Sequence, residues 1–206
     1  MKVIAFSLAV ILTVFLGSAA RAELLLGPSF ITSTTNISAG GFGSIYEIAD
    51  GIDLETDGPP FNGYGPDANS GIITLTLNGP YRIFDFLIAN DINVETEGVK
   101  DFQLRFYDAA DTLLHSTGTL TADYGLVEAQ TFSVGGVEGV NNVSHVEFEV
   151  LNVYELSPDS AIWRIEVREV AFNGIAVPEP TTALLLLSAC LVLVALGRRP
   201  RRSETV

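Results

Sequence analysis

Apolar and polar residues alternate with a period of two in four runs of the chain. Residues 73–77 place three apolar side chains on one face and two threonines on the other, and residues 84–88, 102–107 and 146–150 repeat the alternation. Such runs are typical of strands with one apolar face. The residues that share the apolar faces are Ile73, Leu75, Leu77, Phe84, Phe86, Ile88, Phe102, Leu104, Phe106, Val146, Phe148 and Val150.

The segments between these runs are rich in Gly, Pro, Asn and Asp, which favour turns. No stretch between Glu23 and Ala176 shows a sustained period of 3.6, so we expect helices to be absent or limited to single turns. The pattern predicts an all-β fold in which two antiparallel sheets pack face to face, as a β-sandwich or jelly roll. Asn78-Gly79-Pro80 separates the first two runs and predicts a hairpin or a corner there.

The first 22 residues have the pattern of a secretory signal peptide. Lys2 supplies a positive charge, residues 3–17 are almost all apolar, and the small residues Ala20 and Ala22 occupy an A-x-A cleavage site. A buried N-terminal helix or a permanent anchor is the alternative, but the apolar run is short for a membrane span. We expect cleavage after Ala22 and export through the Sec translocon.

The C-terminal tail, residues 177–206, combines three features. The sequence Val177-Pro178-Glu179-Pro180 is extended and accessible because proline fixes φ and cannot donate to a sheet. A 14-residue apolar stretch, 183–196, follows and lies at the lower limit for a single transmembrane helix. Four arginines then act as a membrane stop that would keep the C-terminus in the cytoplasm: Arg198, Arg199, Arg201 and Arg202.

This tail resembles the PEP-CTERM sorting tail, in which a Pro-Glu-Pro motif, a short transmembrane helix and an arginine cluster follow one another. The resemblance implies recognition by exosortase, a membrane enzyme of Gram-negative bacteria that make extracellular polysaccharide. The motif would comprise Pro178, Glu179 and Pro180. A plain C-terminal anchor that contains Pro-Glu-Pro by accident is the alternative.

The remaining segment, residues 23–176, has the length of one domain with its own core. It contains no cysteine, because Cys190 lies in the tail. Five basic and 23 acidic residues give it a net charge of −18. This charge repels phosphate backbones and argues against nucleic-acid binding. Excess carboxylate serves solubility outside the cell or attracts divalent cations.

An acidic loop provides the first candidate cation site. Four carboxylates and Thr56 lie within residues 50–57, and Gly51 permits a sharp bend. Calcium prefers such oxygen ligands, although the spacing is not that of an EF-hand. A solvated acidic loop without a metal is the alternative.

Glu169 extends the apolar phase of Trp163, Ile165 and Val167 and is therefore expected on the core side near a strand end. A carboxylate there is costly unless it is paired or bound to a metal. The alternatives are a salt bridge to an arginine such as Arg82 or Arg105, or a bulge that turns Glu169 out to solvent.

Catalytic chemistry is not indicated. The two histidines, His115 and His145, lie in no recognisable nucleophile or metal motif, and we expect both at the surface. Paired carboxylates for glycoside hydrolysis depend on separation in space, which sequence cannot supply. Phe61 and Tyr64 are candidates for stacking on a sugar ring, or for capping the core beneath a long loop.

The domain also resembles discoidin-like domains, the coagulation factor 5/8 type C or galactose-binding-like jelly rolls. The similar segments are Ala49-Asp50-Gly51 with Thr56, the strand 100–108, and residues 169–174 at the end of the domain. The resemblance implies a structural calcium held by Asp50, Asp53, Thr56 and Glu169. Asp57 stands where the family often has a tryptophan, which weakens the implication of glycan binding more than that of the fold.

These features together predict an exported bacterial surface or matrix protein, sorted by exosortase, with a non-catalytic binding or structural domain in the polysaccharide layer. The alternatives are a secreted polysaccharide hydrolase and a purely architectural protein that associates with itself.

Overall fold

The computed structural model describes residues 21–37, 40–41, 43–51, 63–91, 98–154 and 164–178. The chain divides into a compact unit, Ala22–Val177, and a second unit formed by Met1–Arg21 and Pro178–Val206. The predicted functional residues that lie outside the described residues are Ala20, Asp53, Thr56, Phe61, Glu179, Pro180, Arg198, Arg199, Arg201 and Arg202.

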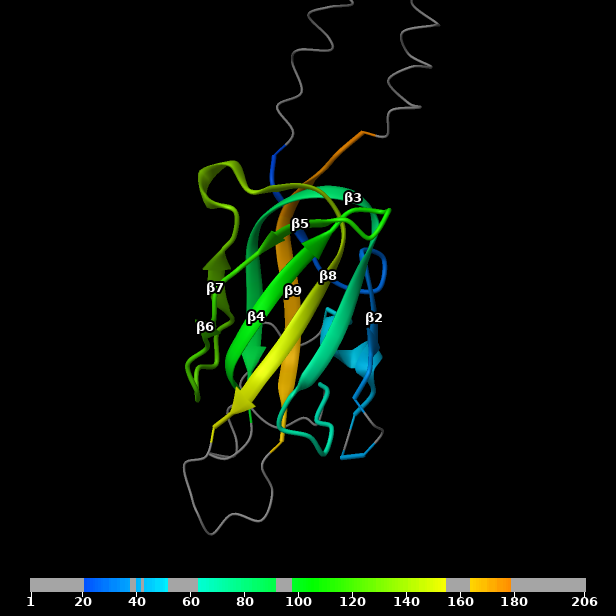
Figure 1. Ribbon diagram of the computed structural model, residues 1–206. Helices are drawn as coiled ribbons and strands as arrows, with labels where there is room; N and C mark the ends of the chain where they lie inside the picture. Colours follow the sequence, from blue (N-terminus) through cyan, green and yellow to red (C-terminus); the bar gives the residue numbers. More distant parts are fainter. Residues whose placement is uncertain are drawn as a thin grey trace, which may run out of the picture. The chain divides into compact units, whose positions relative to one another are not determined.

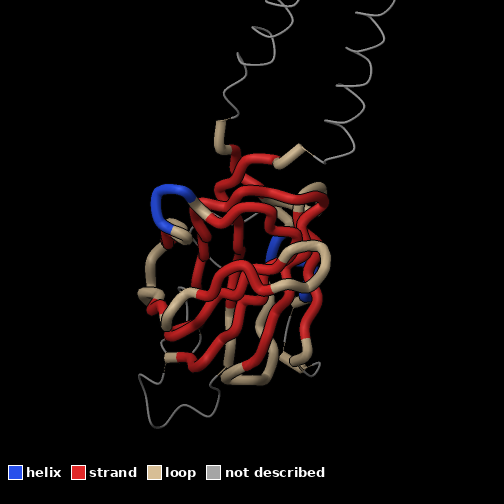
Figure 2. The backbone as a smooth tube through the Cα atoms, turned by 45° about the horizontal axis from the view of Figure 1, so that its top comes forward, coloured by secondary structure: helices blue, strands red, loops and turns tan. Residues whose placement is uncertain are grey.

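Antiparallel strands form almost all of the regular structure of the compact unit (Figure 2). The strands are β1 (Glu23–Leu25), β2 (Ile31–Thr35), β3 (Gly71–Asn90), β4 (Val99–Tyr107), β5 (Leu113–Ser116), β6 (Leu120–Thr121), β7 (Gln130–Ser133), β8 (Val140–Val153) and β9 (Val167–Ala176). The helices described are two short 3-10 segments, η1 (Ile45–Ala49) and η2 (Gly136–Glu138). The prediction of an all-β fold with only single helical turns is therefore confirmed for the described residues.

The long strand β3 passes from one layer of the fold into the other. Its first part pairs with β2 and β8, and its second part pairs with β9 and β7. The register with β8 shifts between Thr76 and Tyr81, across Asn78-Gly79-Pro80, where proline has no N–H to donate. The predicted turn is therefore a corner within one strand, seen as the arch of β3 in Figure 1.

The corner produces two packed layers. One layer has the order β2-β3-β8-β4, with β5 and β6 paired to β4, and the other has the order β1-β9-β3-β7. Figure 1 shows β4 and β8 of the first layer in front of β9 of the second. This is the β-sandwich that the alternation predicts.

Phenylalanine rings from both layers meet in the core. Phe86 of β3 lies 5.6 Å from Phe172 in its own layer, and 5.7 and 5.3 Å from Phe102 and Phe148 in the facing layer, measured between ring centroids. All four side chains are fully buried. Tilted ring pairs at these distances add to the free energy of apolar burial. The four rings therefore join the two layers.

The predicted inward faces are correct except at one position. Ile73, Leu75 and Leu77 and the inward residues of β4 and β8 are buried. Phe84, however, is only half-buried, and its neighbour Ile83 is fully buried instead. The pairing with β9 jumps from Ile83–Gly174 to Asp85–Asn173, so Phe84 is the extra residue of a β-bulge. A bulge breaks the period of two, which sequence alternation alone does not reveal.

Within the part of the chain that the structure describes, no helix is both long enough and apolar enough to span a membrane. The predicted transmembrane segment 183–196 lies outside the described residues.

We expect Phe86→Ala to lower the free energy of unfolding by about 3–5 kcal/mol, because it removes a buried ring and leaves a cavity between the layers. Phe84→Ala is the matched control and should cost about 1 kcal/mol, since its ring is partly exposed. Guanidinium unfolding of the two variants measures both values. Equal losses would contradict the bulge at Phe84.

Candidate functional site

The acidic loop begins where η1 ends. The Ser44 hydroxyl accepts a hydrogen bond from the Tyr46 amide and caps η1, whose C-terminal cap is Asp50. Gly51 follows with φ +90°, in the left-handed region that glycine adopts most readily. A Cβ atom at Gly51 would lie 3.6 Å from Gly27, so the start of the loop lies against the turn between β1 and β2.

Glu169 of β9 meets this loop. Its side chain has no exposed surface, and its carboxylate oxygen Oε2 accepts a hydrogen bond from the Gly51 amide at 3.1 Å. The contact joins positions 118 residues apart in the chain. The start of the acidic loop and the carboxylate near the end of the domain are thus brought together.

A second bulge accounts for the burial of two charged neighbours. Glu169 pairs with Ala89 and Val167 pairs with Asn90, so Arg168 is the extra residue on β9. Both Arg168 and Glu169 are buried. The bulge that we considered as a route to solvent for Glu169 is therefore present, but Glu169 stays inside.

Of the four expected calcium ligands, Asp50 and Glu169 lie among the described residues, and Asp53 and Thr56 do not. Asp50 is half-buried. The residues that the structure describes contain no group of three or more His, Cys, Asp or Glu side chains arranged to hold a metal ion.

Tyr64 occupies the capping position rather than a stacking one. Its backbone pairs with Val167, with N–H to carbonyl oxygen distances of 2.9 and 3.1 Å, and its side chain is only 6% exposed and part of the core. Burial raises the pKa of Tyr64, although a side-chain hydrogen bond with Thr35 opposes the rise. Its ring is not presented at the surface for a sugar, and Phe61 lies outside the described residues.

Arg168 fastens a surface loop at the same end of the sandwich. Its Nε donates to the Asn90 carbonyl at 2.8 Å, and its Nη2 donates to the carbonyls of Leu126 and Val127 at 3.2 and 2.7 Å. Buried carbonyl groups need such donors. The period of two gave no indication of this role, because it assigned Arg168 to the outward phase.

Asn90 joins the ends of β3 and β4 next to Arg168. Its side-chain amide donates to the Val99 carbonyl at 2.7 Å and accepts from the Val99 amide at 2.8 Å. Asn90 has no exposed surface, and its side-chain amide uses both its nitrogen and its oxygen to bond the backbone of Val99. The only sign of this role in the sequence is that Asn90, an amide residue, follows an apolar strand.

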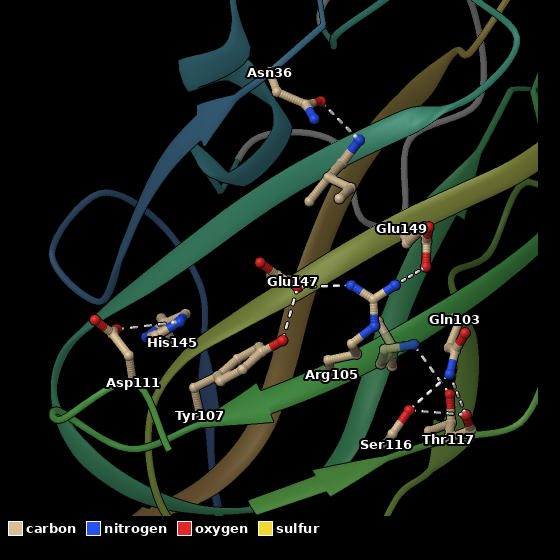
Figure 3. A network of polar contacts seen from close by, with 12 residues as sticks. Asn36, Gln103, Arg105, Tyr107, Asp111, Ser116, Thr117, His145, Glu147 and Glu149 are labelled. Carbon is tan, nitrogen blue, oxygen red and sulfur yellow. Dashed lines mark hydrogen bonds and ion pairs between the residues drawn. The ribbon is translucent and has the colours of Figure 1, made fainter. Parts of the chain in front are cut away.

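A polar network covers the outer face of β4 and β8 (Figure 3). Arg105 of β4 lies between two glutamates of β8, with its Nη1 2.8 Å from Glu147 and its Nη2 hydrogen-bonded to Glu149. The hydrogen bond with Glu147 raises the pKa of Arg105, and burial raises the pKa of Tyr107, whose hydroxyl also bonds to Glu147. Arg105 is thus engaged on the outer face and not with Glu169.

Each histidine ring lies next to an aromatic ring. The His145 ring stacks on Tyr107 with centroids 4.8 Å apart and an angle of 6°, and its Nε2 lies 3.9 Å from Asp111 (Figure 3). The His115 ring lies 6.0 Å from that of Phe106. Both rings therefore lie at the surface and are covered in part by cross-strand partners.

The C-terminal tail is similar to a known sorting motif. Residues 176–202 match the family model of the PEP-CTERM protein-sorting motif. The chain carries a PEP-CTERM tail. The match includes Pro178, Glu179, Pro180 and all four arginines of the predicted membrane stop. A comparison with curated proteins finds no match.

Solved structures similar to the domain are carbohydrate-binding modules and factor 5/8 type C domains. A family 32 module of a family 31 glycoside hydrolase from Clostridium perfringens has 12% identity and a TM-score of 0.57, covering 75% of this chain and 95% of that chain. Another family 32 module from C. perfringens, in complex with galactose, has 8% identity and a TM-score of 0.55, covering 73% and 99%.

An F5/8 type C domain from Bacteroides fragilis has 11% identity and a TM-score of 0.50, covering 76% of this chain and 99% of that chain. At such identities the likeness establishes the fold and not the ligand. The domain therefore has the β-sandwich fold of these modules, and the tail that follows it matches the sorting motif.

Proposed function

We propose that this PEP-CTERM protein is exported and sorted to the cell surface, where its jelly roll binds polysaccharide without cleaving it. The observation that carries the proposal is the sorting motif at residues 176–202, attached to a domain with the fold of carbohydrate-binding modules. A signal peptide ending at Ala22 and the Sec translocon would supply the export step. Exosortase would then recognise the Pro-Glu-Pro segment.

The end of the folded domain suits such processing. The Val177 amide still donates to the Pro80 carbonyl at 2.8 Å, which extends the pairing of β9 by one residue. Pro178 has no N–H and cannot continue the ladder. The domain therefore ends directly before the sorting motif, and removal of the tail would break no strand of the sandwich.

We place the processed protein at the surface or in the extracellular matrix of a Gram-negative bacterium, after transient anchoring by the segment 183–196. Exosortase substrates are expected in bacteria that make extracellular polysaccharide, so a sugar-binding domain would find its ligand there.

Calcium is the cofactor that we propose for the acidic loop, held by Asp50, Asp53, Thr56 and Glu169. Support comes from the buried Glu169 carboxylate and its hydrogen bond to the Gly51 amide. A divalent cation would add a favourable charge interaction to this buried carboxylate, beside the hydrogen bond that it accepts from Gly51. The metal would fasten the loop to β9 and would be structural, with no part in a reaction.

Replacing Pro178, Glu179 and Pro180 by alanine should abolish surface delivery, because the segment that exosortase reads is removed. Cell fractionation with surface protease treatment in the producing bacterium measures the result. Alanine substitution of residues 203–206, beyond the matched segment, is the control and should leave delivery intact. Normal processing and placement of the triple variant would refute the sorting proposal.

Millimolar calcium should raise the melting temperature of the purified chain relative to EDTA. A site saturated a hundredfold above its Kd adds about 2.7 kcal/mol, or roughly 5–10 °C for a domain of this size. Asp50→Asn and Glu169→Gln should each remove most of the shift, whereas Asp67→Asn, outside the acidic loop, should retain it. An equal melting temperature in calcium and EDTA would exclude the calcium site.

The purified chain should be retained on extracellular polysaccharide from the producing bacterium and release no new reducing ends. Cosedimentation measures retention, and a reducing-sugar assay on the same sample measures cleavage. New reducing ends or falling viscosity would favour the hydrolase instead. Self-association without retention would favour the purely architectural protein.

A further inference from the structure

A surface pocket of about 480 Å³ lies between the edge strand β5 and the turn that joins β7 to β8. Leu114 and His115 line it from β5, and Val140 and Asn141 line it from β8. Its volume falls within the roughly 300–1,000 Å³ of typical small-ligand sites.

The pocket is separate from the candidate calcium site. Val140 pairs with Ile83, and Glu169 pairs with Ala89, further along the same strand. At roughly 3.3 Å per residue, the two places are about 20 Å apart along β3.

Glycines shape the turn that forms one wall. Gly135, Gly136 and Gly139 line the pocket, and all have φ between +64° and +67°. A Cβ atom at Gly135 would lie 2.5 Å from the Gly139 carbonyl carbon, and one at Gly139 would lie 2.5 Å from the Ile83 carbonyl oxygen. Side chains are therefore excluded at Gly135 and Gly139, and backbone groups form this part of the wall.

The remaining lining residues combine polar groups with apolar surface. The contact with Phe106 orients the His115 ring, and the Asn141 side-chain oxygen accepts a hydrogen bond from Arg82 at 3.4 Å. Leu114 and Val140 add apolar surface. An imidazole and an amide can bond hydroxyl groups, while aliphatic side chains contact the C–H face of a sugar ring.

Charge decides between a neutral and an acidic sugar. Among the described residues that line the pocket none is a carboxylate, Arg82 beside Asn141 adds one positive charge, and the surrounding domain carries a net charge of −18. A field of that sign opposes the approach of a uronate or sulfate group, and it leaves a neutral sugar unaffected.

We propose that this pocket binds a single neutral sugar unit at a chain end or branch of the polysaccharide, through His115 and Asn141. The inference rests on the proposed carbohydrate binding and assigns it a site that does not involve the acidic loop.

The test titrates the full chain with galactose, glucose, mannose and N-acetylgalactosamine, followed by saturation-transfer NMR, in a detergent without a sugar headgroup. Glucuronate is the acidic comparison. His115→Ala and Asn141→Ala should each weaken the Kd of the bound neutral sugar about tenfold, because each removes a hydrogen-bonding group. His145→Ala, which changes the other histidine, is the matched control and should leave the Kd unchanged. Thermal melting verifies that each variant is folded.

Three results would overturn the inference, namely equal binding by the folded His115 and Asn141 variants, no binding of any of the four neutral sugars, or tighter binding of glucuronate. Retention on polysaccharide separates these failures from failure of the proposed function. A chain that is retained while its pocket variants behave as wild type binds sugar elsewhere, and a chain that is not retained lacks the function itself.

Discussion

The structure depends on the continuity of β3 through its corner. Because one strand serves both layers, the register of each layer is tied to the other, and Phe86 can pack against Phe172 beside it and against Phe102 and Phe148 opposite. The fold has no disulfide to replace this link, since the only cysteine lies in the tail. Packing of aromatic rings across the two layers therefore carries much of the stability of the domain.

The second part of β3 also runs past the three regions for which we propose functions. Tyr81 pairs with Ala176, directly before the sorting motif; Ile83 pairs with Val140 at the pocket; and Ala89 pairs with Glu169 at the acidic loop. Sorting motif, pocket and acidic loop thus follow one another along a single strand. Events at one end, such as removal of the tail, need not disturb the acidic loop, since Tyr81 and Ala89 are about 26 Å apart along the same strand.

The tail was predicted from the local order of its Pro-Glu-Pro segment, apolar stretch and arginines. Sequence alternation predicted the fold, because most strands bury one face. It failed where bulges add a residue. The bulge at Phe84 turns that ring partly outward, and the one at Arg168 buries an arginine beside Glu169. The candidate site was therefore predicted in part. Alternation predicted Glu169 on the core side, but the bulge at Arg168 pairs it with Ala89, out of phase with Val170 and Phe172, and its carboxylate is buried against Gly51, 118 residues away. The hydrogen bonds of Arg168 likewise depend on carbonyl groups 41 and 42 residues away.

The domain has only five basic side chains to offset its acidic residues. Each makes a contact within the fold: Arg82 with Asn141, Lys100 with the Tyr154 ring, Arg105 with Glu147 and Glu149, Arg164 with Asp67 and Glu166, and Arg168 with backbone carbonyls. The 23 acidic residues outnumber these five cations and dominate the field that a ligand meets. Such a surface favours cations and tolerates neutral sugars, whereas it opposes acidic polymers. The negative charge of the domain is thus consistent both with a calcium ion at the acidic loop and with a neutral sugar in the pocket. An acidic polysaccharide could approach only with cations between it and the domain.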